Sequence, residues 1–197
     1  MKVKYTIMVI AAAVVLVAAA ILVVTMPAPD DRTVSERLIL TASDLTGMNA
    51  TQHSEPFPSP YHPALHLGGS EAAESGFSLT VDGWFLDVAC VLVVYNSSSL
   101  ASQAVLDMGL DENYSEMNVG DKCLAGGYYN ETYGTPYVIR SNISAVLLEN
   151  DTITYFIFRT YPVNGSGEVL SADPGTFSLQ NIEGILKAQS DKVKLGA

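Results

Sequence analysis

Three histidines and two cysteines are the residues best suited to metal binding or nucleophilic chemistry. His62 and His66 are four positions apart, a spacing that puts two metal ligands on one face of a helix. Pro63 lies between them and no glutamate follows His62, so a regular helix and the H-E-x-x-H zinc motif are both disfavoured. We interpret these two residues and His53 as polar loop histidines. A zinc site at His62 and His66 is the alternative.

The two cysteines, Cys90 and Cys123, leave two interpretations open. An even count in an exported domain permits one disulfide, whereas two buried thiols would act as small apolar side chains. Ala89 and Val91 flank Cys90, and an apolar setting does not produce the thiolate that a nucleophile requires. The chain also has no G-x-S-x-G elbow and no phosphate-binding glycine loop. We therefore predict no catalytic, cofactor-binding or metal-binding residue.

Two further features have both a functional and a structural interpretation. Asp87 stands inside the apolar strand expected at 84–95, and a buried carboxylate is costly unless it is paired. We predict a structural ion pair with Arg140 or Arg159 rather than a catalytic acid. Four tyrosines crowd into ten residues and form either a recognition surface or, as we favour, a sheet edge with hydrated hydroxyls. They are Tyr128, Tyr129, Tyr133 and Tyr137.

Seven of the nine asparagines stand in N-x-Ser/Thr sequons, where chance predicts about one or two. This excess indicates a chain that is exported and glycosylated; turn-forming asparagines beside common serines and threonines are the alternative. A glycan must face solvent, so Asn142 fits only if residues 141–142 form a turn or an exposed edge. The predicted glycosylation sites are Asn49, Asn96, Asn113, Asn130, Asn142, Asn150 and Asn164.

The first 25 residues predict the topology. Residues 1–5, the cytoplasmic end, carry Lys2 and Lys4, and residues 6–25 contain no charge, proline or glycine. Twenty helical residues span about 30 Å, the thickness of a bilayer's hydrocarbon core. Basic residues precede this span and Asp30 follows it, so the positive-inside rule places the rest of the chain outside the cytoplasm. We predict a retained single-pass transmembrane helix in the cell membrane; a cleaved signal peptide is the alternative.

The remaining chain has the length of one domain and is strongly acidic. A linker is predicted at residues 26–33 and a single extracytoplasmic domain at residues 34–197. The formal net charge is −11, and leaving out Lys2 and Lys4 makes it −13. Such a charge repels the phosphate backbone, so we expect no nucleic acid partner.

Hydrophobic periodicity predicts an α+β domain with a mostly antiparallel sheet packed with helices. The strongest strand, 84–95, is apolar on both faces, so we expect it to be central and covered on both sides. Helices are expected at 97–108 and 178–186, each capped by a serine. Four prolines within eight residues predict an irregular surface segment at 45–75. Shorter strands are expected at 77–81, 137–140, 143–149 and 152–160.

The succession of motifs resembles a family of extracytoplasmic proteins. It consists of LILTASDLTG at 38–47, paired strands, a helix with Ala101 and Ala104, VGD at 119–121, IRSNI at 139–143 and a closing helix. This order is similar to the PsbP-like α/β domain of membrane-tethered archaeal and bacterial proteins, as in LpqN-type lipoproteins. The resemblance covers about residues 34–194 and implies a binding or accessory module. The chain departs from it by lacking a lipid-attachment cysteine and by an insert at 52–69.

These observations together predict a membrane-anchored, glycosylated module that binds a protein or small-molecule partner without catalysis. One alternative is a tethered or secreted hydrolase whose site is built from residues 52–69. The other is a structural glycoprotein of the cell envelope.

Overall fold

The computed structural model describes residues 30–110, 113–133, 138–163 and 177–196. The chain divides into two units, Met1–Asp31 and Arg32–Ala197, and the fold described here is that of the second unit. Within the described ranges, no helix has the length and apolar character needed to cross a membrane. The transmembrane helix predicted at residues 6–25 lies outside those ranges.

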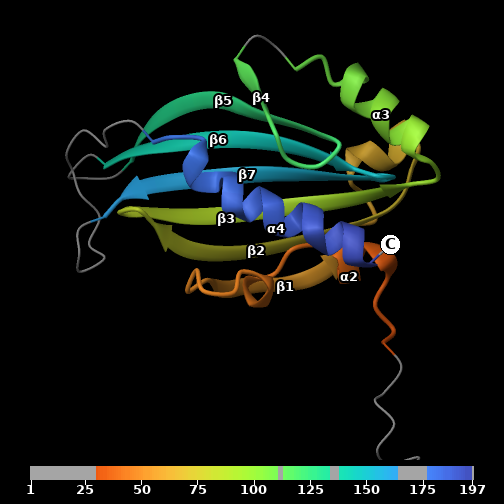
Figure 1. Ribbon diagram of the computed structural model, residues 1–197, viewed down its shortest axis with the longest axis horizontal. Coiled ribbons are helices and arrows are strands. Elements are labelled where there is room, and N and C mark those ends of the chain that lie inside the picture. Colours follow the sequence, from red (N-terminus) through yellow and green to blue (C-terminus); the bar gives the residue numbers. More distant parts are fainter. Residues whose placement is uncertain (1–29, 111–112, 134–137, 164–176, 197) are drawn as a thin grey trace, which may run out of the picture. The chain divides into compact units, whose positions relative to one another are not determined.

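The domain is built on one seven-stranded antiparallel sheet (Figure 1). Its order is β1-β2-β3-β7-β6-β5-β4, so two meanders meet where β3 pairs with β7. The α+β architecture with a mostly antiparallel sheet is therefore confirmed. The strands are β1 (Thr51–Pro58), β2 (Gly69–Val81), β3 (Trp84–Tyr95), β4 (Tyr114–Met117), β5 (Lys122–Tyr133), β6 (Val138–Glu149) and β7 (Thr152–Pro162).

The helices cover the two faces of the sheet unequally. The long helix α4 runs across one face, whereas α3 and η2 gather at one end of the other face (Figure 1). Ser97 caps α3 by accepting a hydrogen bond from Leu100 N at 3.3 Å, as the sequence predicts. The helices are α2 (Val34–Leu38), η1 (Ala42–Asp44), η2 (Pro63–Leu67), α3 (Ser98–Asp107) and α4 (Gln180–Gly196).

Strand β3 shows the difference in burial between the two faces of the sheet. Its alternate residues Leu86, Val88, Cys90 and Leu92 belong to the main core with α4 and are at most 1% exposed. On the other face only Val93 and Tyr95, near α3, are fully buried. The expectation that this strand is covered on both faces is therefore right for one face and wrong for most of the other.

The segment predicted to be irregular, 45–75, contains strand β1 and the first half of β2. Pro56 and Pro58 fit into β1 because it is an edge strand that pairs only with β2, and an edge strand has amides that need no ladder partner. The pairing has register shifts between Gln52 and Ser54 and again before Phe57. Proline content alone therefore did not reveal that this stretch joins the sheet.

The chain at the end of α2 and just after it, residues 38–40, runs inside the core, and none of its three side chains is more than 5% exposed. Buried backbone amides and carbonyls need hydrogen-bond partners. Gln189 of α4, which is fully buried, supplies two of them. Leu40 N donates to Gln189 Oε1 at 2.7 Å, and Gln189 Nε2 donates to Leu38 O at 3.0 Å.

Two other side chains complete the hydrogen bonding of this stretch. Lys192 Nζ donates to Ile39 O at 2.7 Å, and Ser75 Oγ of β2 donates to Leu40 O at 2.6 Å. Lys192 Nζ also lies 2.7 Å from Asp44 Oδ2 in η1. Side chains of α4 and β2 therefore take the place of a neighbouring strand.

Replacing Gln189 by alanine should lower the free energy of unfolding by about 2–5 kcal/mol, because two buried backbone groups lose their partners. Urea unfolding followed by circular dichroism measures this change. The matched control is Gln103→Ala on the exposed face of α3, which we expect to stay within about 0.5 kcal/mol of the parent. Equal losses in the two variants would contradict the role assigned to Gln189.

Asp44 should make part of the stability depend on pH. Burial on its own raises the pKa of Asp44, but hydrogen bonds from Lys192 and Thr41 outweigh burial and hold this pKa below its ordinary value. A carboxyl group whose pKa is lower in the folded state than in the unfolded state stabilises the fold at pH values above its unfolded pKa, which is near 3.9. That stabilisation is lost as the pH falls through the folded value.

We therefore expect Asp44→Asn to be less stable than the parent by about 1–2 kcal/mol at pH 7. The difference should shrink as the pH falls below about 4. Urea unfolding across this pH range is the measurement. Asp107→Asn, an exposed control on α3, should show no such convergence. A constant offset between Asp44→Asn and the parent at all pH values would exclude the lowered pKa.

Candidate functional site

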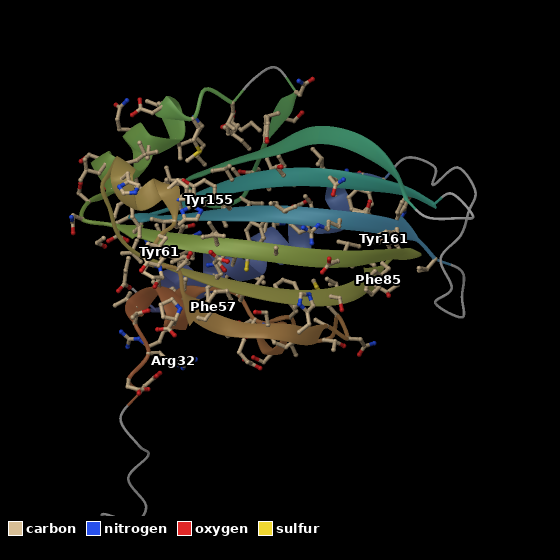
Figure 2. The ribbon with its side chains drawn as sticks, turned by 180° about the vertical axis from the view of Figure 1, so that it is seen from behind. Arg32, Phe57, Tyr61, Phe85, Tyr155 and Tyr161 are labelled. Atoms are coloured by element: carbon tan, nitrogen blue, oxygen red, sulfur yellow. The ribbon has the colours of Figure 1, made fainter. Side chains whose placement is uncertain are left out.

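Among the described residues, no helix covers the sheet face opposite α4 beyond the end where α3 and η2 lie (Figure 1 and Figure 2). We call it the open face and define it by Phe85, Asp87 and Ala89 of β3 with their cross-strand neighbours Tyr161, Arg159 and Ile157 of β7. Ile157 is 45% exposed although it sits in the middle of a central strand. Figure 2 shows this face with Phe85 and Tyr161 at one end and Phe57, Tyr61 and Tyr155 towards the other.

A polar network that includes one ion pair lies at the centre of the open face. Asp87 Oδ1 is 3.1 Å from His53 Nε2 of β1, and Asp87 Oδ2 accepts a hydrogen bond from Arg159 Nη1 of β7 at 3.3 Å. The predicted pairing of Asp87 with an arginine on a neighbouring strand is therefore confirmed for Arg159. The side chain of Arg140 lies outside the described part. The partnership of His53 was not foreseen.

His53 reaches Asp87 because Gly76 lies between them on β2. A Cβ atom at Gly76 would stand 2.6 Å from His53 Cε1 and 3.0 Å from Nδ1, closer than real side chains pack. The absence of a side chain at this position is what lets an imidazole from the edge strand extend across β2 to β3. Gly76 thereby determines the geometry of the whole network.

Aromatic rings occupy both ends of the open face. Phe85 and Tyr161 pair across β3 and β7 with ring centroids 6.3 Å apart at 47°. At the other end the rings of His62 and Tyr155 lie 5.6 Å apart. Burial lowers the pKa of His62 below its ordinary value, although the charge of Glu74 opposes this, so His62 is neutral at pH 7.

The zinc alternative for His62 and His66 gains no support from their placement. His66 is exposed in η2, and His62 packs against Tyr155 before that helix begins. Among the described residues, no group of three or more histidine, cysteine, aspartate or glutamate side chains is arranged to hold a metal ion.

Cys90 and Cys123 are both buried free thiols, so the predicted disulfide is not formed. The reason lies in the sheet order, because β7 and β6 separate β3 from β5. Three strand spacings amount to about 14 Å, whereas a disulfide needs Cα atoms within about 7 Å. Burial raises the pKa of each thiol to about 12, which keeps both protonated and unreactive.

The predicted glycosylation sites differ in accessibility. Asn142 is 1% exposed in β6, which pairs with β5 on one side and β7 on the other. Residues 141–142 are therefore neither a turn nor an edge, and a glycan on Asn142 has no room in the folded domain. Four sites have exposed side chains: Asn49, Asn96, Asn113 and Asn150. Asn164 and Tyr137 lie outside what the structure describes, as do the side chains of Asn130, Tyr128, Tyr129 and Tyr133 in β5.

A second candidate site is a pocket of about 730 Å³ between α2, η1 and the C-terminal end of α4. Its walls are apolar at Val34, Leu38 and Leu195 and polar at Ser43 and Thr46. Four charged side chains also line it: Arg37, Asp44, Asp191 and Lys192. No sequence pattern indicated this pocket, because its residues come from segments about 150 positions apart.

The sequence matches no protein-family model and no curated protein. The function therefore has to be argued from the two sites themselves.

A double-mutant cycle tests whether Gly76 positions His53. Gly76→Ala should destabilise the domain by about 1 kcal/mol, since the added methyl group displaces the exposed His53 ring from Asp87. In a His53→Ala background the same change should cost less, by about 1 kcal/mol. Urea unfolding of the four proteins gives the coupling energy. A coupling of zero would show that His53 does not lie over Gly76.

Proposed function

We propose that this chain is a membrane-anchored, extracytoplasmic binding module that uses the open face of its sheet to hold a partner. The observation that carries this proposal is the exposure of Ile157, Phe57 and Tyr61 on one side of the sheet. The half-buried rings of Phe85 and Tyr161 lie next to the pair of Asp87 and Arg159 on the same face. Exposed apolar patches of this kind mark interaction sites, and aromatic residues with arginine are enriched where proteins bind partners.

The energetics of the central network favour recognition over stabilisation. The side chains of His53, Asp87 and Arg159 are 46%, 30% and 41% exposed. Ion pairs with this much solvent contact contribute only about 0–1 kcal/mol to stability. A partner that excluded water from the same charges would strengthen their interactions, because the local dielectric would fall.

The location of the module rests on the sequence. The apolar span at residues 6–25, the basic residues before it and the excess of sequons support an anchored chain whose domain lies outside the cytoplasm. The similarity to PsbP-like domains of tethered proteins supports the same assignment and a role as an accessory module. The four exposed sequons stand outside β2, β3 and β7, so glycans on them would leave the centre of the open face accessible.

Site-specific photo-cross-linking on intact cells tests the proposal. A p-benzoylphenylalanine in place of Ile157 should give a discrete cross-linked product, and Tyr161→Ala should reduce its yield. The matched control places the same residue at Leu106, which is 63% exposed on α3. A membrane-impermeant amine reagent should label the domain on the same cells. Identical products from both positions would refute the binding face, and a domain protected from the reagent would refute the location.

A further inference from the structure

The pocket between α2, η1 and α4 is lined by two cationic and two anionic side chains. Among the described residues, only one cation and one anion of these four form an ion pair. Lys192 and Asp44 pair with each other at 2.7 Å. Arg37 and Asp191 line the same pocket, and neither has an ion pair or hydrogen bond from its side chain among the described residues. Among the described residues, Arg37 and Asp191 are therefore a cation and an anion without partners that line the same pocket.

Other polar groups in the pocket add a hydrogen-bond donor beside the cation and a helix end that favours a bound cation. Lys192 uses two of its three ammonium protons, on Ile39 O and Asp44, and has one donor to spare near Arg37. Leu195 and Gly196 bring the last turn of α4 to the pocket, and the C-terminal end of a helix favours a cation. The pocket thus offers donors for an oxyanion and, separately, acceptors for an ammonium group.

The lining also includes accessible apolar side chains. Leu195 is 88% exposed and Val34 is 40% exposed, and Leu38 lies beneath them as part of the core. A volume of about 730 Å³ is within the usual range for small-molecule sites. An apolar group of moderate size can therefore contact these side chains while its charged end reaches the polar part.

We propose that this pocket binds a zwitterion that carries an oxyanion, a primary ammonium group and an apolar tail. Arg37, with the spare donor of Lys192, holds the oxyanion, and Asp191 holds the ammonium group. Val34 and Leu195 contact the tail. Two sources provide this chemistry, a free apolar amino acid and the head group of an aminophospholipid. The site is separate from the open face and does not depend on the function proposed for it.

Calorimetric titration of the full chain in a neutral maltoside detergent tests the proposal. The zwitterionic probes are L-leucine and dihexanoyl phosphatidylethanolamine. The matched single-charge probes are 4-methylpentanoate, which is leucine without its ammonium group, and 3-methylbutylamine, which is leucine without its carboxylate. At least one zwitterion should bind about tenfold more tightly than either single-charge probe. Binding of leucine identifies the free amino acid as the source, and binding of the phospholipid alone identifies the head group.

Two variants test which side chain binds which charged group of the ligand. Arg37→Gln and Asp191→Asn should each weaken binding of the zwitterion about tenfold. Asp191→Asn should leave the weak binding of 4-methylpentanoate unchanged or improved. Asp107→Asn on α3 is the matched control, exposed and outside the pocket lining, and should bind like the parent. The proposal is overturned if no zwitterion binds more tightly than about 10 mM, or if Arg37→Gln and Asp191→Asn bind like the parent.

Discussion

The hydrogen bonding of residues 38–40 is the constraint on which the rest of the domain depends. This stretch is buried in the main core without a strand beside it, and a buried amide or carbonyl without a partner costs about 1–3 kcal/mol. Gln189, Lys192 and Ser75 supply the partners. These bonds join α4 and β2 to residues 38–40. The position of α4 on this face therefore depends on hydrogen bonds to buried backbone groups as well as on apolar packing.

The same constraint produces the two candidate sites. Because α4 packs on one face of the sheet, no helix in the described part of the chain covers most of the other face (Figure 1). Cross-strand contacts such as Asp87 with Arg159 occupy that face instead. Lys192 holds Ile39 and Asp44 in place and, from that position, forms part of the pocket wall. The two sites lie on different parts of the domain and serve different proposed ligands.

Local patterns predicted elements that depend on hydrophobic period and on near neighbours, such as strand β3 and the serine cap of α3. The pairing of Asp87 with Arg159 was also predicted, although the Asp87 side chain is 30% exposed and not buried as expected. Strand β1 was not predicted, because its prolines are compatible with a strand only at an edge, and edge position is a property of the whole sheet. The continuous strand β6 through Asn142 was missed for a related reason, since its polar residues resemble a turn.

The sequence by itself determined the class of the domain, the helix caps and the strong central strand, because these depend on hydrophobic period and on bonds between near neighbours. It also carries the predicted span and sequons. Only the tertiary structure decided that the two cysteines are too far apart to bond, since strand order sets their distance. It alone brought His53 across Gly76 to Asp87 and placed Arg37 and Asp191 around one cavity. These arrangements join residues far apart in the chain, and long-range contacts leave no local periodic signal.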